Sequence, residues 1–127
     1  MQQHVFIIDD DPIFRLMSKK MISNLAVPKL SIIECEDGQI GIEQLSKLRA
    51  SKDNVVILLD INMPILDGWN FLEELEKQHR FDLQQVTVCM VTSSTDDSDV
   101  HKAKKYKLVK KFVHKPLHID DLKSLLG

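Results

Sequence analysis

Short apolar runs alternate five times with segments of helical periodicity along this chain of 127 residues. Three of the runs, at residues 5–8, 55–59 and 86–91, are almost continuously apolar, which is typical of parallel strands buried on both faces. The run at residues 30–35 is more mixed in polarity and fits an edge strand, and a short fifth run covers residues 112–113. This alternation limits the chain to folds built from strand-helix units.

Apolar side chains recur at intervals of three and four residues after each run, which predicts five helices. Asp11 and Pro12 indicate the start of the first helix, because Asp caps helices and Pro fits the first helical position. The acidic residues at positions 96, 97 and 99 favour the start of the fourth helix. The residues that carry the spacing are Phe14, Met17, Met21 and Leu25; Gly41, Leu45 and Leu48; Gly68, Leu72 and Leu75; Val100 and Ala103; and Ile119, Leu122 and Leu126.

Strand-helix alternation of this kind predicts an α/β fold: a doubly wound, five-stranded parallel sheet with helices on both faces and right-handed crossovers. The sequence has no evident linker, internal repeat or low-complexity segment, and its length suits one domain, so we predict a single domain over residues 1–127. Hydrophobic residues make up 43% of the chain, which is enough for a core of this size. The methionines are expected to fill that core.

The charge balance excludes some classes of protein. Charged residues make up 28% of the chain and the net charge is −2, which argues against a disordered chain and against a strongly basic nucleic-acid binder. Cys35 and Cys89 lie in apolar runs and are expected to be buried free thiols in a reducing compartment. Because there is no apolar run of ~20 residues and no signal-peptide pattern, we expect a cytoplasmic protein without membrane contact.

Polar side chains follow the predicted strands at the edge where open parallel sheets bind ligands. Asp9, Asp10 and Asp11 follow the first strand and Asp60 follows the third; Thr92, Ser93 and Ser94 follow the fourth, and Lys115 with Pro116 follows the fifth. Three or four carboxylates, hydroxyls and one ammonium group are therefore expected to converge at one edge of the sheet.

Such a cluster predicts a metal-assisted reaction at an aspartate. Packing Asp9, Asp10 and Asp60 together is costly through like-charge repulsion unless a cation offsets it, and Mg²⁺ suits a site of carboxylate oxygens. An aspartate held in this way can act as a nucleophile toward phosphorus. Mg²⁺ and Lys115 would then neutralise oxygens in the transition state of phosphoryl transfer.

Four segments together resemble the response-regulator receiver family of two-component signalling, of the chemotaxis-regulator type, over essentially the whole chain. They read VFIIDDDP at residues 5–12, VILLDINMPILDGW at 56–69, VTSS at 91–94 and FVHKPL at 112–117. Four motifs in this order and spacing are specific, whereas any one alone would be weak. The resemblance implies a flavodoxin-like fold of five βα units with strand order 2-1-3-4-5.

The resemblance also implies roles for residues of the acidic cluster. Asp60 corresponds to the phosphoacceptor, and Asp9 and Asp10 correspond to the metal-binding acidic pair. Asp10 is expected to bind Mg²⁺ directly and Asp9 through water. Asn62 matches the position whose backbone carbonyl completes the metal shell, whereas Asp11 is expected only to cap the first helix.

Further roles fall on the fourth and fifth strands. Thr92 resembles the switch hydroxyl, Lys115 the lysine that contacts the phosphate, and Phe112 the switch aromatic, here without the phenol of the usual Tyr. The peptide bond between Lys115 and Pro116 is expected to be cis. The family usually has Gly-Ala between the fourth helix and the fifth strand; this chain has Leu108-Val109, so the helix end is expected to lack a left-handed cap.

The function implied is that of a signalling module that takes a phosphoryl group from a phosphohistidine on a sensor histidine kinase or a histidine phosphotransfer protein. It would catalyse only its own phosphorylation and dephosphorylation, so it would not be an enzyme with an external substrate. Since no helix-turn-helix or other nucleic-acid module follows, we expect it to signal by contact with a downstream protein rather than by binding nucleic acid.

Three alternatives stay open at this point. A phosphohydrolase of the haloacid-dehalogenase type also uses an aspartate after a buried strand, but Ile13 stands where that motif has Thr or Val, and the chain leaves no room for a cap domain. A pseudo-receiver used only for binding is disfavoured by the complete set of functional residues. A lysine-rich segment is either a solvated basic face or a docking surface for an acidic partner; it contains Lys102, Lys104, Lys105, Lys107, Lys110, Lys111 and Lys115.

Overall fold

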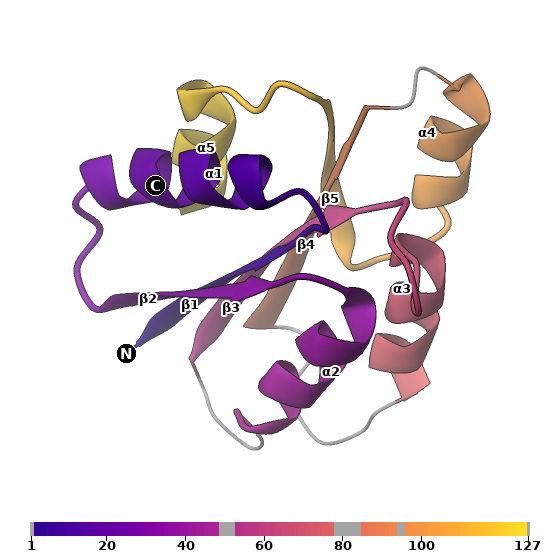
Figure 1. Cartoon of the computed structure of the whole chain (residues 1–127), viewed down its shortest axis with the longest axis horizontal. Coiled ribbons are helices and arrows are strands. Elements are labelled where there is room, and N and C mark those ends of the chain that lie inside the picture. Colours follow the sequence, from indigo (N-terminus) through magenta and orange to yellow (C-terminus); the bar gives the residue numbers. More distant parts are fainter. Residues whose placement is uncertain (1, 49–52, 78–84, 94–95, 127) are drawn as a thin grey trace.

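A computed structural model describes residues 2–48, 53–77, 85–93 and 96–126, and Figure 1 shows them as a twisted sheet with helices on both faces. In chain order the elements are β1 Gln3–Ile8, α1 Pro12–Asn24, β2 Leu30–Cys35, α2 Gly38–Ser46, β3 Asn54–Asp60, α3 Gly68–Lys77, β4 Val86–Thr92, α4 Asp97–Ala103, β5 Val109–His114 and α5 Ile119–Leu126.

The strand order is β2-β1-β3-β4-β5 and every neighbouring pair is parallel, as the sequence predicted. The interior strands β1, β3 and β4 carry the most continuous apolar runs because helices cover them on both faces. The mixed run of β2 lies at one edge of the sheet, also as predicted.

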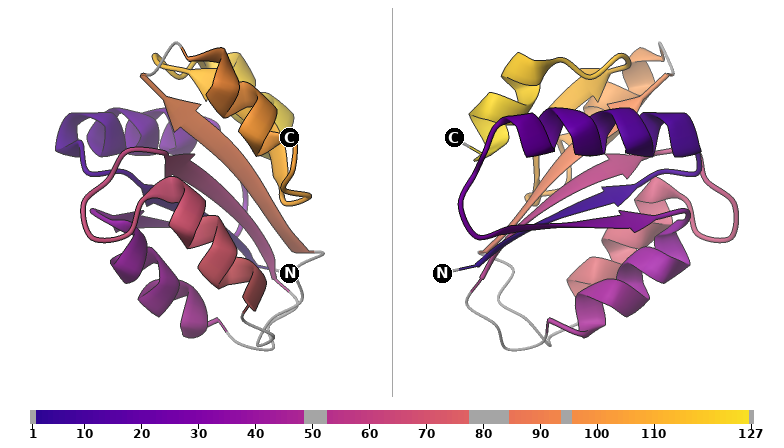
Figure 2. Two further views of the ribbon diagram at one scale, coloured as in Figure 1. Left: turned by 90° about the vertical axis from the view of Figure 1, so that its right-hand side faces the viewer. Right: turned by 60° about the vertical axis from the view of Figure 1, so that its left-hand side comes forward.

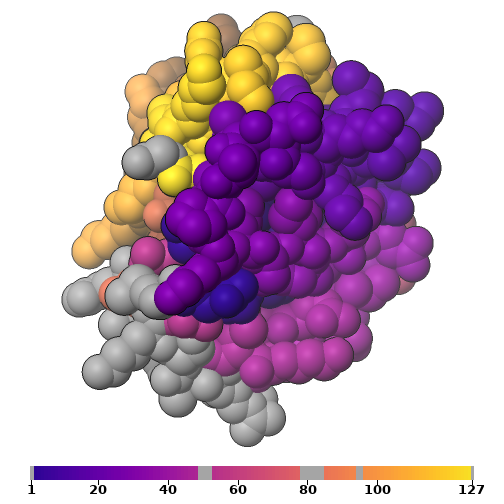
Figure 3. Space-filling view, turned by 90° about the vertical axis from the view of Figure 1, so that its left-hand side faces the viewer, coloured from indigo at the N-terminus to yellow at the C-terminus, as the bar shows by residue number. Residues whose placement is uncertain are grey.

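Alternate side chains of the strands belong to two hydrophobic clusters, one on each face of the sheet. One cluster lies under α1 and α5 and includes Val5, Ile22, Leu58, Val91 and Leu122. The other lies under α2, α3 and α4 and includes Phe6, Leu45, Ile57, Phe71, Met90 and Ala103. Figure 2 shows the sheet between these two helical layers, and in the space-filling view of Figure 3 the yellow atoms of α5 lie directly beside those of α1.

The first helix begins where the sequence predicted but buries a different stripe. Asp11 caps α1 by accepting a hydrogen bond from the backbone N–H of Ile13, and Pro12 occupies the first turn. Ser18 and Ile22 face the sheet, whereas Met17 is 58% exposed. The expectation that Met17 belongs to the buried face and fills the core is therefore wrong, because α1 has more apolar residues than the face against the sheet can cover.

The connection between α4 and β5 has no left-handed cap, as expected. Asp96 caps the start of α4, as the acidic stretch indicated, and the helix ends at Ala103. No described residue of this connection has a left-handed backbone. Turn hydrogen bonds from Tyr106 to Ala103 and from Val109 to Tyr106 close it, and Leu108 is buried in the core.

The fifth strand is longer than the short apolar run predicted. It begins at Val109, three residues before Phe112, because Lys110 and Lys111 take part in an edge strand whose polar side chains hide the pattern. Pairing with β4 shifts register between Val88 and Cys89.

The two cysteines are buried and free, as predicted. Burial is the main reason that the pKa of each thiol is raised to about 12, so both stay protonated and unreactive at neutral pH. None of the described helices is long and apolar enough to cross a membrane.

Candidate functional site

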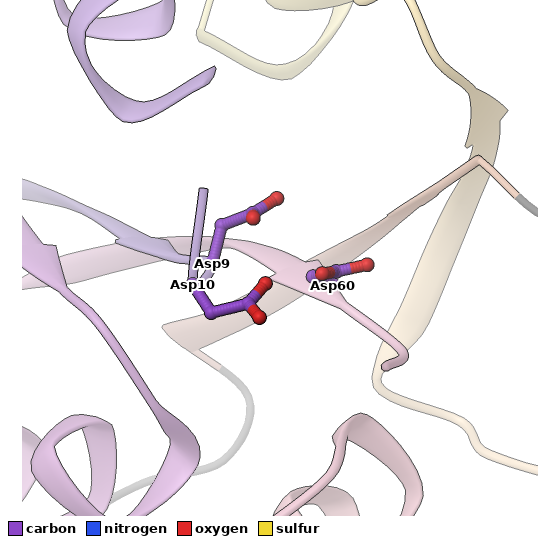
Figure 4. Close-up of side chains that lie close together, drawn as sticks. All are labelled: Asp9, Asp10 and Asp60. Carbon is purple, nitrogen blue, oxygen red and sulfur yellow. The ribbon is translucent and has the colours of Figure 1, made fainter. Parts of the chain in front are cut away.

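Two neighbouring strands bring the acidic residues together. In the pairing of β1 with β3, Ile8 lies opposite Leu59, so the residues that come next, Asp9 and Asp60, emerge side by side at the C-terminal edge of the sheet. Figure 4 shows their carboxylates close to that of Asp10. One carboxylate oxygen from each of the three residues lies within 4.8 Å of the others. Asp9 and Asp60 are buried, whereas Asp10 is exposed.

Asp9 is held from several directions. Its backbone N–H donates to the carbonyl of Cys35 on β2 at 3.0 Å, and its Oδ1 accepts from the backbone N–H of Asp11 at 2.9 Å. Its Oδ2 lies 2.9 Å from Nζ of Lys115. The side chain of Asp9 is only 1% exposed, so this ammonium group is a close partner for a buried carboxylate.

Lys115 reaches the acidic cluster from the end of β5, the edge strand of the sheet. Its backbone N–H donates to the carbonyl of Thr92 at 2.7 Å, which joins the ends of β4 and β5. The peptide bond to Pro116 is cis, as expected. The ammonium group also lies 4.5 Å from the ring centroid of Phe14, so it sits between a carboxylate and an aromatic face.

Thr92 and Phe112 lie on neighbouring strands, as expected. Thr92 ends β4, is fully buried and pairs with His114. Phe112 pairs with Met90 two positions earlier, so the side chains of Thr92 and Phe112 project from the same face of the sheet. Phe112 is half-buried against the core, with its ring centroid 5.5 Å from that of His114.

Burial and like charges make Asp60 a weak acid. Its pKa is raised to about 7, first by desolvation and then by the carboxylate of Asp9. The ammonium group of Lys115 lowers this pKa, Asp10 raises it, and a hydrogen bond from the backbone N–H of Asn62 lowers it again. Ionising Asp60 is therefore unfavourable until more positive charge arrives.

The donor set fits a hard divalent cation. Three carboxylates meet at the open edge of the sheet, and among the described residues they form the group whose ligand atoms are close enough to hold a metal ion. Oxygen ligands of this kind suit Mg²⁺, which would supply the positive charge that Asp60 lacks. The side chain of Asn62 is exposed beside the cluster, and Ser94 lies outside the described residues.

The sequence did not indicate two residues of α1 that contact the cluster. Arg15 donates from Nη1 to the backbone carbonyl of Asp9 at 2.6 Å, and Phe14 lies under the ammonium group of Lys115. A helical side chain points back toward the N-terminus of its helix, so residues in the first turn of α1 can reach the loop before it. That geometry was the only available signal, since neither residue type is specific for such a contact.

Comparisons with known proteins agree with one another. A family model described as the response regulator receiver domain matches residues 5–127. The chemotaxis protein CheY1 of Helicobacter pylori is 27% identical over 122 residues, which is 96% of this chain and 92% of that protein. A protein-glutamate methylesterase/protein-glutamine glutaminase of Carboxydothermus hydrogenoformans is 40% identical over 93 residues, but the match covers 72% of this chain and only 24% of that protein.

Solved structures show the same fold. A two-component response regulator from Cytophaga hutchinsonii superimposes with a TM-score of 0.84 at 28% identity, covering 98% of this chain and 93% of that one. A response regulator receiver protein from Dyadobacter fermentans gives a TM-score of 0.85 at 25% identity, covering 98% of this chain and 94% of that one.

The raised pKa of Asp60 predicts how stability depends on pH without metal. The folded state binds this proton more tightly than the unfolded state, whose carboxyl has a pKa near 3.8. Protonation therefore stabilises the fold, and this contribution, up to about 4 kcal/mol, is lost as pH rises from about 4 through about 7. Urea unfolding in chelator should show that Asp60→Asn gains free energy of unfolding relative to wild type over this range. Parallel pH curves for the two proteins would contradict the result.

Proposed function

Since the chain belongs to the response regulator receiver family, we propose that Asp60 accepts a phosphoryl group from a phosphohistidine in the presence of Mg²⁺. The observation that carries the proposal is the cluster itself: a buried aspartate with a pKa raised to about 7 lies beside two further carboxylates and a lysine. A group of this kind is inert alone but becomes a competent nucleophile when a cation neutralises its neighbours.

Asp10, Asp60 and the backbone carbonyl of Asn62 would hold the ion directly, and Asp9 would hold it through water. When bound, Mg²⁺ supplies positive charge that favours the ionised form of Asp60 and draws negative charge from the phosphoryl oxygens. Asp9 contributes mainly by holding Lys115, whose ammonium group lies 2.9 Å from its carboxylate.

In the transfer step a carboxylate oxygen of Asp60 attacks the phosphorus atom of the phosphohistidine. The P–N bond breaks and its electron pair stays on the ring nitrogen. The other ring nitrogen carries a proton, so the histidine leaves as a neutral imidazole. Lys115 then turns from Asp9 toward a phosphoryl oxygen, and the hydroxyl of Thr92 donates to another. Because hydrolysis by water regenerates Asp60, the domain would catalyse only its own phosphorylation and dephosphorylation.

A phosphohistidine donor is a protein, so it would cover the mouth of the site during transfer. A phosphohistidine has to approach Asp60 over the start of α1 and the loop between β3 and α3, which lie at the same edge of the sheet (Figure 2). Both segments expose apolar side chains: Ile13 is 67% exposed, Leu16 52%, Met17 58% and Ile65 81%. Ile65 also has a φ of 70°, which turns the loop sharply at this point. We propose these four residues as the docking surface for the donor.

A kinase partner follows from membership of the family, and one relative is the sensor histidine kinase CheAY of Helicobacter pylori. The cognate donor would be a sensor kinase or a phosphotransfer protein, since either carries the phosphohistidine. We also propose that the protein works in the cytoplasm, where both its buried thiols and its phosphodonor would be found. The family match sets aside the haloacid-dehalogenase alternative.

Thr92 and Phe112 would transmit the conformational change from the phosphorylated site to the surface. When Thr92 moves toward the phosphoryl group, the ring of Phe112 can turn further inward on the same face of the sheet. It already packs against the core, and a cavity of about 160 Å³ lies beside it between α4 and β5. Phe112 has no phenol hydroxyl that could form a hydrogen bond when the ring turns inward. Full burial of the partly exposed ring therefore gains at most ~2 kcal/mol, so the two orientations would be closely balanced.

The surface that would change shape is basic. Lys104, Lys110 and Lys111 line the cavity beside Phe112. The connection that follows α4 is tied to α3, because the Trp69 and Tyr106 rings stack at 5.9 Å and Tyr106 donates to Glu73 at 2.7 Å. Movement is therefore easiest on the β5 side, and we propose that a downstream protein with an acidic surface docks there.

The phosphoacceptor assignment predicts a single modification. Incubation with acetyl phosphate and Mg²⁺ should add one phosphoryl group, and Asp60→Asn should abolish it. The matched control is Asp11→Asn, since Asp11 caps α1 but lies outside the carboxylate cluster, and this variant should label as wild type does. Intact-protein mass spectrometry gives the readout. Full labelling of the Asp60→Asn protein would contradict the assignment of Asp60 as the phosphoacceptor.

The docking surface predicts that one substitution affects transfer from a protein donor but not from a small-molecule donor. Leu16→Lys should slow transfer from a phosphorylated histidine phosphotransfer domain about tenfold or more. The reason is that an apolar side chain that the docked donor would bury is replaced by a charged one. Labelling by acetyl phosphate should stay within about twofold, since a small donor needs no docking surface. Ser23→Lys, an exposed change at the far end of α1, serves as control. Equal slowing with both donors would place Leu16 in the chemistry and not in docking.

The switch predicts correlated movement. Addition of beryllofluoride with Mg²⁺, which mimics the phosphoryl group, should shift the NMR signals of Thr92, Phe112 and residues 102–111 together. Thr92→Ala should uncouple the shifts of Phe112 and the lysine segment while the site still binds the mimic. Shifts confined to the carboxylate cluster in the wild type would show that α4 and β5 are not the output surface.

A further inference from the structure

Arg15 makes two contacts that none of the roles above uses. Its Nη1 donates to the backbone carbonyl of Asp9 at 2.6 Å, and its Nε lies 3.4 Å from Oε1 of Glu34 on β2. The Arg15 side chain is 16% exposed, so its charge is largely withdrawn from solvent beside the acidic cluster. A planar guanidinium with donors on two sides can make both contacts at once.

The carbonyl that Arg15 binds belongs to the peptide unit joining Asp9 to Asp10. Because a peptide unit is planar, fixing its oxygen also fixes the nitrogen and Cα of Asp10, so that only rotation about the N–Cα bond is left to set the direction in which the Asp10 side chain leaves the backbone. The backbone of Asp10 has a second restraint on its other side, where the N–H of Asp11 donates to Oδ1 of Asp9 at 2.9 Å. Asp10 itself is exposed and has no comparable packing to orient it.

Glu34 holds the guanidinium in place. It sits on β2 opposite Ile7 of β1, one residue before Cys35, whose carbonyl accepts the N–H of Asp9. Arg15 and Cys35 therefore anchor the two ends of the Asp9 backbone to the same strand. Lys19 lies 3.8 Å from the other oxygen of Glu34, and among the described residues no hydrogen bond or ion pair joins it to the loop.

We infer that Arg15 is a positioning residue for the metal site: with Glu34 behind it, it aims the carboxylate of Asp10 at the ion by holding the peptide unit between Asp9 and Asp10. This inference rests on the proposed function, because it concerns the same ion. It differs from two simpler roles, in which Arg15 only adds positive charge near the carboxylates or only ties α1 to β2.

Three variants separate these roles. Arg15→Lys keeps the charge but cannot reach the carbonyl and Glu34 together, so positioning predicts a loss that a role through charge alone does not. Glu34→Gln leaves the guanidinium charge and its hydrogen bond to Asp9 but weakens the hold on Arg15. Lys19→Gln is the matched control, since it removes a positive charge next to Glu34 without touching the loop.

The measurements are the Mg²⁺ dissociation constant by calorimetry and the melting temperature in chelator. Arg15→Lys should weaken Mg²⁺ binding about tenfold or more, as is typical when a residue that orients a metal ligand is lost. Glu34→Gln should weaken it in the same direction by less, and Lys19→Gln should stay within about twofold.

Two results would overturn the inference. Wild-type Mg²⁺ affinity in Arg15→Lys, with or without a lower melting temperature, would reduce Arg15 to a source of charge or a tie between α1 and β2. If Lys19→Gln strengthened Mg²⁺ binding as much as Glu34→Gln weakened it, net charge and not position would matter, because the two changes shift the charge in opposite directions. If the wild-type protein itself binds no Mg²⁺, the proposed function fails first, so the two failures are distinguishable.

Discussion

The repulsion among Asp9, Asp10 and Asp60 is the constraint on which the rest of this structure depends. Parallel pairing of β1 with β3 brings two of these residues side by side, and burial denies them the water that would screen their charges. Lys115 brings positive charge to the cluster from the end of β5, and a divalent cation would bring more from solvent. Arg15, in the first turn of α1, holds the backbone carbonyl of Asp9. A site that is incomplete without a cation is one that can respond to a negatively charged phosphoryl group.

The rest of the fold makes this arrangement rigid on one side and adjustable on the other. Interior strands covered on both faces leave the carboxylates little freedom, and hydrogen bonds to Cys35 and from Asp11 fix Asp9 in particular. Toward β5 the structure is looser: Phe112 is half-buried, and a cavity lies beside it. A change of charge at the rigid side can therefore be expressed as movement at the adjustable side, which is what a signalling domain requires.

Much of this was predictable from the sequence because the strongest signals are local. Three nearly continuous apolar runs identified the interior strands, Asp11 and Pro12 identified the start of α1, and residues directly after the strands identified the cluster. The failures share a cause: they depend on which neighbours a residue meets in three dimensions. Met17 has the right spacing but no surface to cover it, and the contact between Arg15 and the Asp9 carbonyl has no signature in residue type.

The most direct test of the central claim is to count the protons released when Mg²⁺ binds, by calorimetry in buffers of different ionisation enthalpy. With the pKa of Asp60 at about 7 before binding, the ion should expel more than about half a proton near pH 6.5 and almost none near pH 8.5. Asp60→Asn should abolish the release. Binding of Mg²⁺ at pH 6.5 without any release of protons, or the same release from Asp60→Asn, would contradict the view that repulsion at Asp60 is what the cation relieves.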